Sequence, residues 1–216
     1  MIELKQFQQL AADTIASRFG EYISDPVEAG TKKHRRTIPF VQMLASITAS
    51  GKTVILADAV ATISTELPVK PVILWLSKGK VVVEQSLANL QGGGKYHHLI
   101  QNCEVKTLAE FDLDALSNDG RAYVYFATVG TFNHSDRTTS TLNIYKSDLD
   151  TTDQATWDKL KQRTAPDGSR RPLIVVYDEA HNLSDQQTDI LFGLGPSAFL
   201  LASASMRLPE IGRAHV

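Results

Sequence analysis

The chain has 216 residues, of which 43% are apolar and 21% charged, and its formal net charge is −2. This is the composition of a globular protein with one sizeable core, and it excludes a protein that binds polyanions through overall positive charge. The sequence has no run of 18 apolar residues and no signal-peptide layout, so we expect no membrane partner and a cytoplasmic location. The single cysteine, Cys103, excludes an internal disulfide and a cysteine-rich zinc site, and we expect it to fill the core or a near-surface position.

The first predicted element is an amphipathic helix. Apolar residues recur at helical spacing from Leu4 to Phe19, and the helix is predicted to end near Gly20. A loop with Pro26 and Gly30 is expected to follow. It contains the run KKHRR at residues 32–36, which we interpret as a solvated loop and only weakly as a nucleic-acid contact.

Short apolar runs alternate with helical stretches over the rest of the chain. We predict strands over residues 38–44, 72–76, 123–127, 173–177 and 199–202, and helices over residues 53–61, 81–90, 153–163 and 185–192. The polar stretch 133–152 is predicted to be an insertion or a long loop. Because the strands are apolar on both faces, the sequence predicts an α/β fold, a parallel sheet with helices on both faces.

The stretch ITASGKT at residues 47–53 joins a predicted strand to a predicted helix and ends like a phosphate-binding loop. Backbone N–H groups at a helix N-terminus attract an anion, because unsatisfied donors and the helix dipole both face it. Lys52 would reach the β- and γ-phosphates, and the Thr53 hydroxyl would bind a magnesium ion. The residues that we expect to bind nucleotide here are Ala49, Ser50, Gly51, Lys52 and Thr53.

A second motif, DEAH at residues 178–181, directly follows the apolar run LIVVY. An aspartate at the carboxyl end of a strand, here Asp178, can hold magnesium against a bound triphosphate, and Glu179 can polarise the attacking water. We reject the alternative of a chance acidic turn, because both motifs occur together and each follows an apolar run. Lys52, Asp178 and Glu179 are therefore the predicted catalytic residues, Thr53 and Asp178 the predicted metal ligands, and ATP and Mg²⁺ the predicted cofactors.

The order of these motifs and of the later Ser203-Ala204-Ser205 resembles the first RecA-like lobe of superfamily-two helicases and translocases. Within that superfamily, IELKQFQQLA, VVYDEAHNLS and ASASMRLP resemble type III restriction enzyme motor (Res) subunits, up to about Pro209. The resemblance implies a RecA-like P-loop NTPase lobe in which hydrolysis of Mg-ATP is coupled to movement along duplex DNA. It also implies two further partners, a second RecA-like lobe in cis and a modification or specificity subunit.

The same resemblance implies roles for residues outside the two main motifs. Gln8 is similar to the glutamine that reads the adenine edge, although a surface helix glutamine is an equal alternative. His181 and the segment Ser203, Ala204 and Ser205 resemble the parts that link the nucleotide state to the grip on nucleic acid. The alternative for the serines is that they merely end a strand.

Two further segments resemble nucleic-acid contacts of this lobe. Ser77, Lys78 and Lys80 follow the second predicted strand, and Thr128 follows the third. Hydroxyls, amides and lysines suit phosphate contacts, which position a nucleic acid without reading its sequence. A plain turn between strand and helix is the alternative at both places.

The loop departs from the usual glycine pattern. The full phosphate-loop pattern has glycine where this chain has Ser46, and the helicase variant has one where it has Ala49. Related helicases tolerate small residues at the position of Ala49, so we expect nucleotide to bind. Because alanine resists a positive φ angle, we expect a lower affinity than glycine would give.

Residues 1–36 are predicted to form the N-terminal helix and adenine-motif region, and residues 37–210 the ATP-binding lobe. The last six residues, IGRAHV at 211–216, resemble the translation of a widely used short-read sequencing adapter. We therefore hypothesise an artefactual tail on a truncated fragment without the second lobe, the alternative being a natural hexapeptide.

Other functions remain open at this point. The near alternative is a repair or RNA helicase of the same superfamily. A free-standing nucleotide- and nucleic-acid-binding module would bind without turnover, and we expect the 216-residue fragment alone to be inactive or very slow. A degenerate, inactive homologue is the third possibility, motivated by Ala49 and Ser205.

Overall fold

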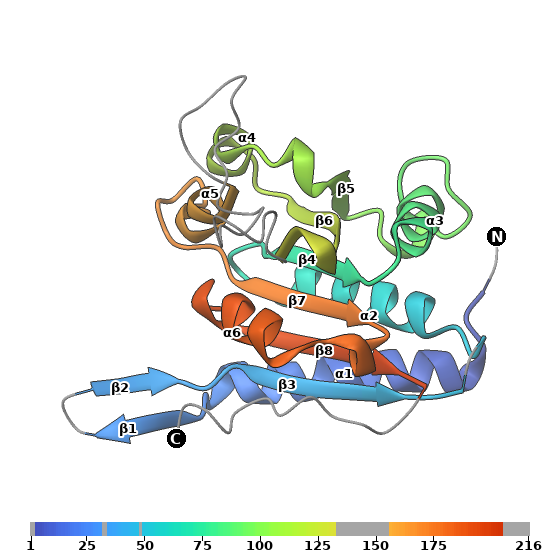
Figure 1. The fold of residues 1–216 in the computed structure, drawn as a ribbon, viewed down its shortest axis with the longest axis horizontal. Helices are drawn as coiled ribbons and strands as arrows, with labels where there is room; N and C mark the ends of the chain where they lie inside the picture. The colour runs from blue at the N-terminus through green and yellow to red at the C-terminus, as the bar shows by residue number, and fades with distance from the viewer. Residues whose placement is uncertain (1–2, 32–33, 48, 133–155, 205–216) are drawn as a thin grey trace, which may run out of the picture.

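A computed structural model describes residues 3–31, 34–47, 49–132 and 156–204. Its centre is a six-stranded parallel sheet with the strand order β3-β8-β7-β4-β6-β5 (Figure 1). A separate antiparallel hairpin is formed by β1 and β2. The strands are β1 (Glu28–Thr31), β2 (His34–Thr37), β3 (Phe40–Ala45), β4 (Val72–Ser77), β5 (Cys103–Thr107), β6 (Ala122–Thr128), β7 (Leu173–Asp178) and β8 (Ala198–Ser203).

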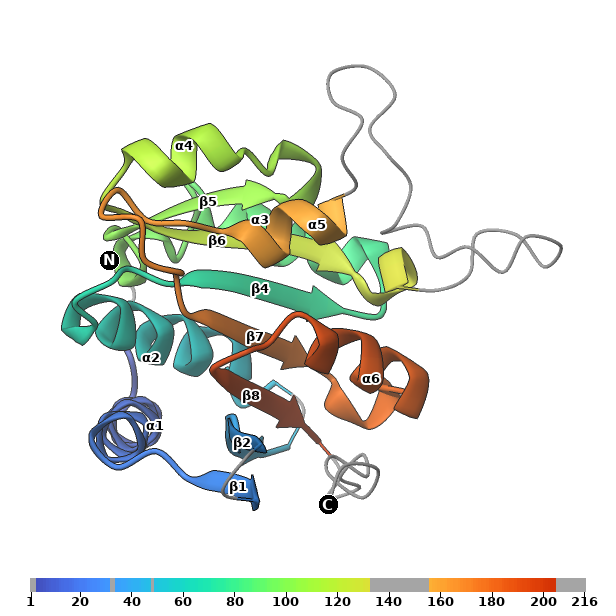
Figure 2. The ribbon, with the colours of Figure 1, turned by 90° about the vertical axis from the view of Figure 1, so that its left-hand side faces the viewer.

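Helices cover both faces of the sheet (Figure 2). One layer contains α1 (Gln6–Ser24), α2 (Lys52–Glu66) and α3 (Lys80–Leu90), and the other contains α4 (Leu113–Asn118), α5 (Thr156–Gln162) and α6 (Asp185–Gly193). The short 3-10 helices include η2 (Leu108–Glu110), η3 (Val129–Phe132) and η5 (Ala180–Asn182). The predicted fold class is thereby confirmed.

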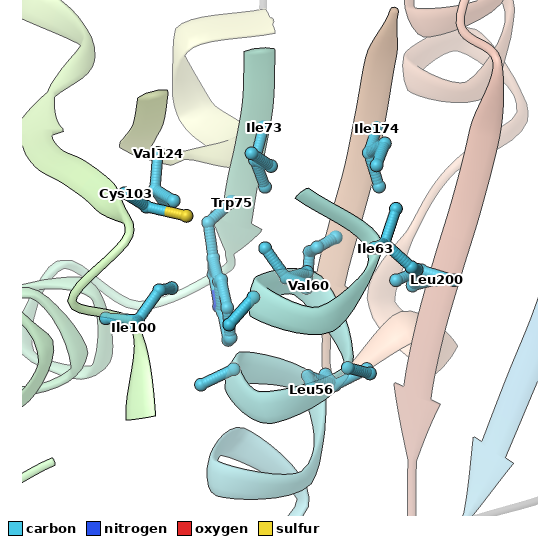
Figure 3. Packing of buried hydrophobic residues seen from close by; sticks show 14 of the residues in the cluster. Leu56, Val60, Ile63, Ile73, Trp75, Ile100, Cys103, Val124, Ile174 and Leu200 are labelled. Carbon is cyan, nitrogen blue, oxygen red and sulfur yellow. The ribbon is translucent and has the colours of Figure 1, made fainter. Parts of the chain in front are cut away.

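The central strands are buried along their whole length, because helices pack on both of their faces. Along β4, Ile73 and Trp75 face α2, whereas Leu74 and Leu76 belong to the cluster under α4, α5 and α6. Figure 3 shows the cluster that contains Ile73 and Trp75, in which side chains from neighbouring strands point toward α2. Cys103 belongs to this cluster and is 6% exposed, which confirms its predicted place in the core.

Helix α1 packs against α2 and shares the core with the sheet through Ala12, Ile15, Ala16 and Phe19. The prediction that this helix ends near Gly20 is wrong. The helix continues because Tyr22 is also anchored, with its ring centroid 5.6 Å from that of Phe40 and its hydroxyl donating to Ile38 O at 2.6 Å.

The prediction of a loop around Pro26 and Gly30 is also wrong, because this region forms the hairpin of β1 and β2. Glu28 pairs with Thr37 at its base and Thr31 with His34 near its turn. Gly30 has φ 116°, a conformation that favours glycine and that the sequence alone does not reveal.

The remaining differences concern short or extended elements. Strand β3 begins at Phe40 and not at residue 38, since proline at position 39 has no N–H to donate to a neighbour. Helix α2 runs five residues beyond its predicted end. The edge strand β5 and the six-residue α4 were not predicted, because β5 is mostly half-exposed and shows no continuous apolar run.

Two arginines, Arg163 and Arg171, are each only 1% exposed at the amino-terminal edge of the sheet. The Arg163 guanidinium donates to the carbonyl oxygens of Leu160, Leu194, Gly195 and Arg171. Arg171 donates to those of Lys70, Arg121, Leu116 and Asp119. Burial, with the charge of Arg170, lowers the pKa of Arg163 to about 9, so this guanidinium stays charged at neutral pH.

Within the part of the chain that the structure describes, no helix is both long enough and apolar enough to cross a membrane.

Candidate nucleotide site

The segment between β3 and α2 forms a tight loop at the carboxyl-terminal edge of the sheet. Gly51 lies at the N-cap of α2 with φ 87°, and its carbonyl oxygen accepts from Val54 N and Ile55 N at 3.1 Å. Helix α2 has 15 residues, and its first N–H groups have no acceptor within the helix. The unpaired donors and the helix dipole together make this end suitable for an anion such as a phosphate group.

The side chain of Lys52, the first residue of α2, reaches back across the loop and fixes its curvature. Its Nζ donates to Ser46 O at 3.1 Å and to Ile47 O at 3.0 Å, so it joins the end of the loop to its beginning. An ammonium group carries three donors. Because two of these donors bond to carbonyl oxygens of the loop, one N–H remains to donate a hydrogen bond to an anion in the loop.

The two main motifs meet across the sheet. Thr53 Oγ1 donates to Asp178 Oδ2 at 3.1 Å, although the two residues are 125 positions apart. Asp178 is the last residue of β7 and is 7% exposed, and burial raises the pKa of its carboxyl against the opposing effects of the Thr53 hydrogen bond and the Lys52 charge. A hydroxyl and a buried carboxylate are hard oxygen donors, so the pair fits Mg²⁺.

Glu179 follows Asp178 directly but is exposed. It has φ 65° and ψ 47°, a left-handed conformation, and this turns the chain out of β7 into η5. Its carboxylate therefore lies at the open side of the edge, next to the buried Asp178.

Gln8 lies against the phosphate loop, as its predicted role requires. Its Nε2 donates to Ser50 O at 2.9 Å, and its Oε1 accepts from Lys5 N at 2.9 Å. A Cβ atom at Gly51 would displace the Gln8 amide from this contact, and the φ of 87° at Gly51 also favours glycine. Both polar atoms of the Gln8 amide thus have partners within the chain, and adenine reading stays a prediction.

Ala49 is one of two residues other than glycine that have a positive φ among the described residues, the other being Glu179. Its φ is 63°, in the left-handed region where a Cβ atom is unfavourable by about 1–2 kcal/mol. The missing glycine noted in the sequence therefore has a structural consequence. The loop keeps the backbone conformation that glycine would adopt freely.

Ser203, at the end of β8, forms hydrogen bonds with His181 of the DEAH motif and with Ser46, just before the phosphate loop. Its hydroxyl is 3.2 Å from His181 Nδ1, and its carbonyl oxygen accepts from Ser46 N at 3.1 Å. In the sequence, Ser46 stands out only as a position that lacks glycine, because no pattern in a single sequence shows that the preceding strand pairs with β8. Ala204 is exposed, and Ser205 lies outside the described residues.

The predicted nucleic-acid contacts gather at the ends of β4 and β6, where Ser77 pairs in register with Thr128. Ser77 itself is only 2% exposed. Its hydroxyl therefore does not lie at the surface, where the predicted phosphate contact would need it. Lys78 and Lys80 are exposed, Thr128 is half-buried, and Lys80 forms an exposed ion pair with Glu84 at 3.6 Å. Of the four predicted contacts, only the two lysines are exposed.

Comparison with known proteins identifies a family and a similar solved structure. The family model described as "Type III restriction enzyme, res subunit" (ResIII) matches residues 1–205. Among solved structures, a nuclease-deletion mutant of the Type ISP restriction-modification enzyme LlaGI in complex with a DNA substrate mimic has 13% identity and a TM-score of 0.48. The alignment covers 99% of this chain and 19% of that one, so the chain spans about a fifth of its length. No curated protein matches the sequence.

Proposed function

Since the chain belongs to the family of type III restriction enzyme res subunits, we propose that its helicase-type ATP-binding lobe hydrolyses Mg-ATP as part of a motor that moves along duplex DNA. The observation that carries this proposal is the hydrogen bond between Thr53 and Asp178. It brings a phosphate loop and an acidic strand end into contact, which is the arrangement that holds a metal-bound triphosphate.

Each polar group of the site has a part in this proposal. The N-terminus of α2 and the loop N–H groups bind the phosphates, and the third Lys52 donor reaches the terminal phosphoryl group. Thr53 and Asp178 would hold Mg²⁺, which when bound neutralises charge on the phosphate oxygens. The exposed Glu179 carboxylate polarises the attacking water and takes up its proton.

The contacts of Ser203 support a coupling role within the same proposal. Ser203 is bonded to Ser46 at the start of the loop and to His181 of the DEAH motif, so a shift of either changes the position of β8's end. Lys78 and Lys80 are proposed to contact DNA phosphates, because cationic side chains at this edge position a backbone without reading bases.

The test is calorimetric titration with Mg-ATP of the wild type and of Lys52→Ala. A hydrogen bond to a charged group contributes about 1.5–3 kcal/mol, so we expect affinity to fall by at least about tenfold. Lys95→Ala is the matched control, since Lys95 is exposed after α3 and its Nζ lies 5.0 Å from the Tyr96 ring. Equal heats from wild type and Lys52→Ala would rule out the loop as the phosphate site.

A further inference from the structure

The hairpin of β1 and β2 extends beyond the start of β3, away from the strand ends that carry the nucleotide site (Figure 1). Neither core cluster of the described residues contains a residue of β1 or β2. The base of the hairpin is nevertheless fixed, because Ile38 N donates to Val27 O at 2.8 Å and Tyr22 Oη donates to Ile38 O at 2.6 Å. It is an anchored projection that adds nothing to the core.

The hairpin segment also has a charge opposite to that of the chain. Residues 27–37 contain four Lys or Arg residues and one acidic residue, a net charge of +3 with His34 neutral. Since the whole chain has a net charge of −2, the remaining residues sum to −5. Arg35 and Arg36, the basic residues that the structure describes here, are both exposed.

An isolated two-stranded ribbon without a hydrophobic face is at most marginally stable in water. A ribbon of this width fits the major groove of duplex DNA, and consecutive residues of a strand point to opposite faces. Arg35 and Arg36 therefore present one guanidinium on each face of β2. Such a ribbon can contact the phosphates on either side of a groove.

We propose that this basic hairpin is a second DNA contact of the lobe, made to the phosphate backbone of duplex DNA through Arg35 and Arg36. The choice of duplex DNA as the polymer rests on the proposed function. The contact is separate from Lys78 and Lys80, because it lies at the amino-terminal end of β3 and they lie at the carboxyl-terminal edge of the sheet.

Replacing Glu28 provides a second test, in which the affinity for duplex DNA is expected to rise instead of fall. Its carboxylate lies 3.1 Å from Arg35 Nη1, with the two side chains 50% and 64% exposed. An ion pair this exposed contributes little to stability and is easily exchanged for a phosphate. Glu28→Gln removes the competitor of the phosphate, so this variant is expected to bind duplex DNA about twofold to fivefold more tightly.

The experiment measures the anisotropy of a labelled duplex of about 25 base pairs with the full chain, at several salt concentrations between about 50 and 200 mM. Each phosphate contact contributes about −0.9 to the slope of log affinity against log salt. We expect Arg35→Ala with Arg36→Ala to reduce that slope by about 2 and affinity at low salt by about tenfold. An unchanged slope and affinity would overturn the proposal.

The matched control is Arg18→Ala with Lys161→Ala, which removes the same charge from exposed positions on α1 and α5. An equal loss in this control would overturn the proposal by assigning the effect to net charge. Single-stranded RNA of equal length that competes as well as the duplex would overturn the choice of duplex DNA. The hairpin variant should bind Mg-ATP as the wild type does. Failure of the DNA-contact proposal can therefore be told apart from failure of the nucleotide-site proposal, which the Lys52→Ala titration tests.

Discussion

At the scale of single residues, Ala49 has the least favourable backbone in the phosphate loop. Because its φ is 63°, replacing it with glycine removes strain, and this gain exceeds the entropy that glycine adds to the unfolded chain. We expect Ala49→Gly to raise the free energy of unfolding by about 1 kcal/mol, or about 2–4 °C in Tm. It should also tighten Mg-ATP binding. Thermal unfolding and calorimetry measure the two effects.

The control for this substitution is Ala88→Gly, at an exposed position inside α3 with ordinary helical backbone. At this position glycine should lower the free energy of unfolding by about 1 kcal/mol, the opposite of the change expected at Ala49. If both variants lose stability, the left-handed conformation of Ala49 is not a source of strain.

At Asp178, in contrast to Ala49, stability and function oppose each other. Burial raises the pKa of its carboxyl, so the protonated form stabilises the fold, and that contribution is lost as the pH rises through the raised pKa. At neutral pH we therefore expect Asp178→Asn to raise Tm without ligand and to abolish stabilisation by Mg-ATP. The gain in Tm should shrink as the pH falls through the raised pKa. Asp185→Asn, which removes a carboxylate from the exposed first turn of α6, should lower Tm slightly and leave the stabilisation by Mg-ATP unchanged.

Several of these residues could be assigned from sequence and others could not. Thr53 and Asp178 lie together, because parallel strands bring motifs at their carboxyl ends to one edge, and the roles of these residues and of Lys52 stay predictions. The burial of Ser77 and the bonds of Ser46 depend on which strands are neighbours, and this pairing is not encoded in any local pattern.

At the scale of elements, the strands with continuous apolar runs were predicted to within two residues, because burial on both faces leaves a strong signal. The hairpin and β5 leave no such signal. Their side chains are polar or half-exposed, and their pairing is decided by backbone geometry and by neighbours far away in sequence.

The buried arginines were missed for a related reason, since arginine in a sequence normally indicates a surface. Arg163→Ala would remove the guanidinium that donates to four carbonyl oxygens at the ends of α5, α6 and β7, of which Leu194 O keeps a hydrogen bond from Arg170. We expect a loss of about 3–5 kcal/mol, which lowers Tm by about 6–20 °C. Below that Tm, Mg-ATP affinity should be unchanged, because Arg163 lies at the opposite edge from the loop. Urea unfolding of Arg163→Ala beside Arg170→Ala, an exposed residue whose guanidinium donates to Leu194 O, measures the difference.

At the scale of the whole molecule, the single thiol reports on global unfolding. Cys103 is 6% exposed in the main core, and burial raises its pKa to about 11, so at pH 8 little thiolate is present or accessible. We expect native labelling by a thiol reagent to be slow, to accelerate in urea, and to slow further with Mg-ATP, which stabilises only the folded chain. Rapid labelling of the native chain would show that this side of the core opens locally.

The pairing of β3 with β8 also determines when the site can form during synthesis. Phe40 pairs with Ala198 and Ala45 with Ser203, and β8 is the only strand that pairs with β3 in the described part of the chain. On the ribosome, the phosphate loop leaves the exit tunnel early, but its strand must wait until β8 has been synthesised before it can join the sheet. We therefore expect ATP to bind the nascent chain only once β8 has been translated and docked.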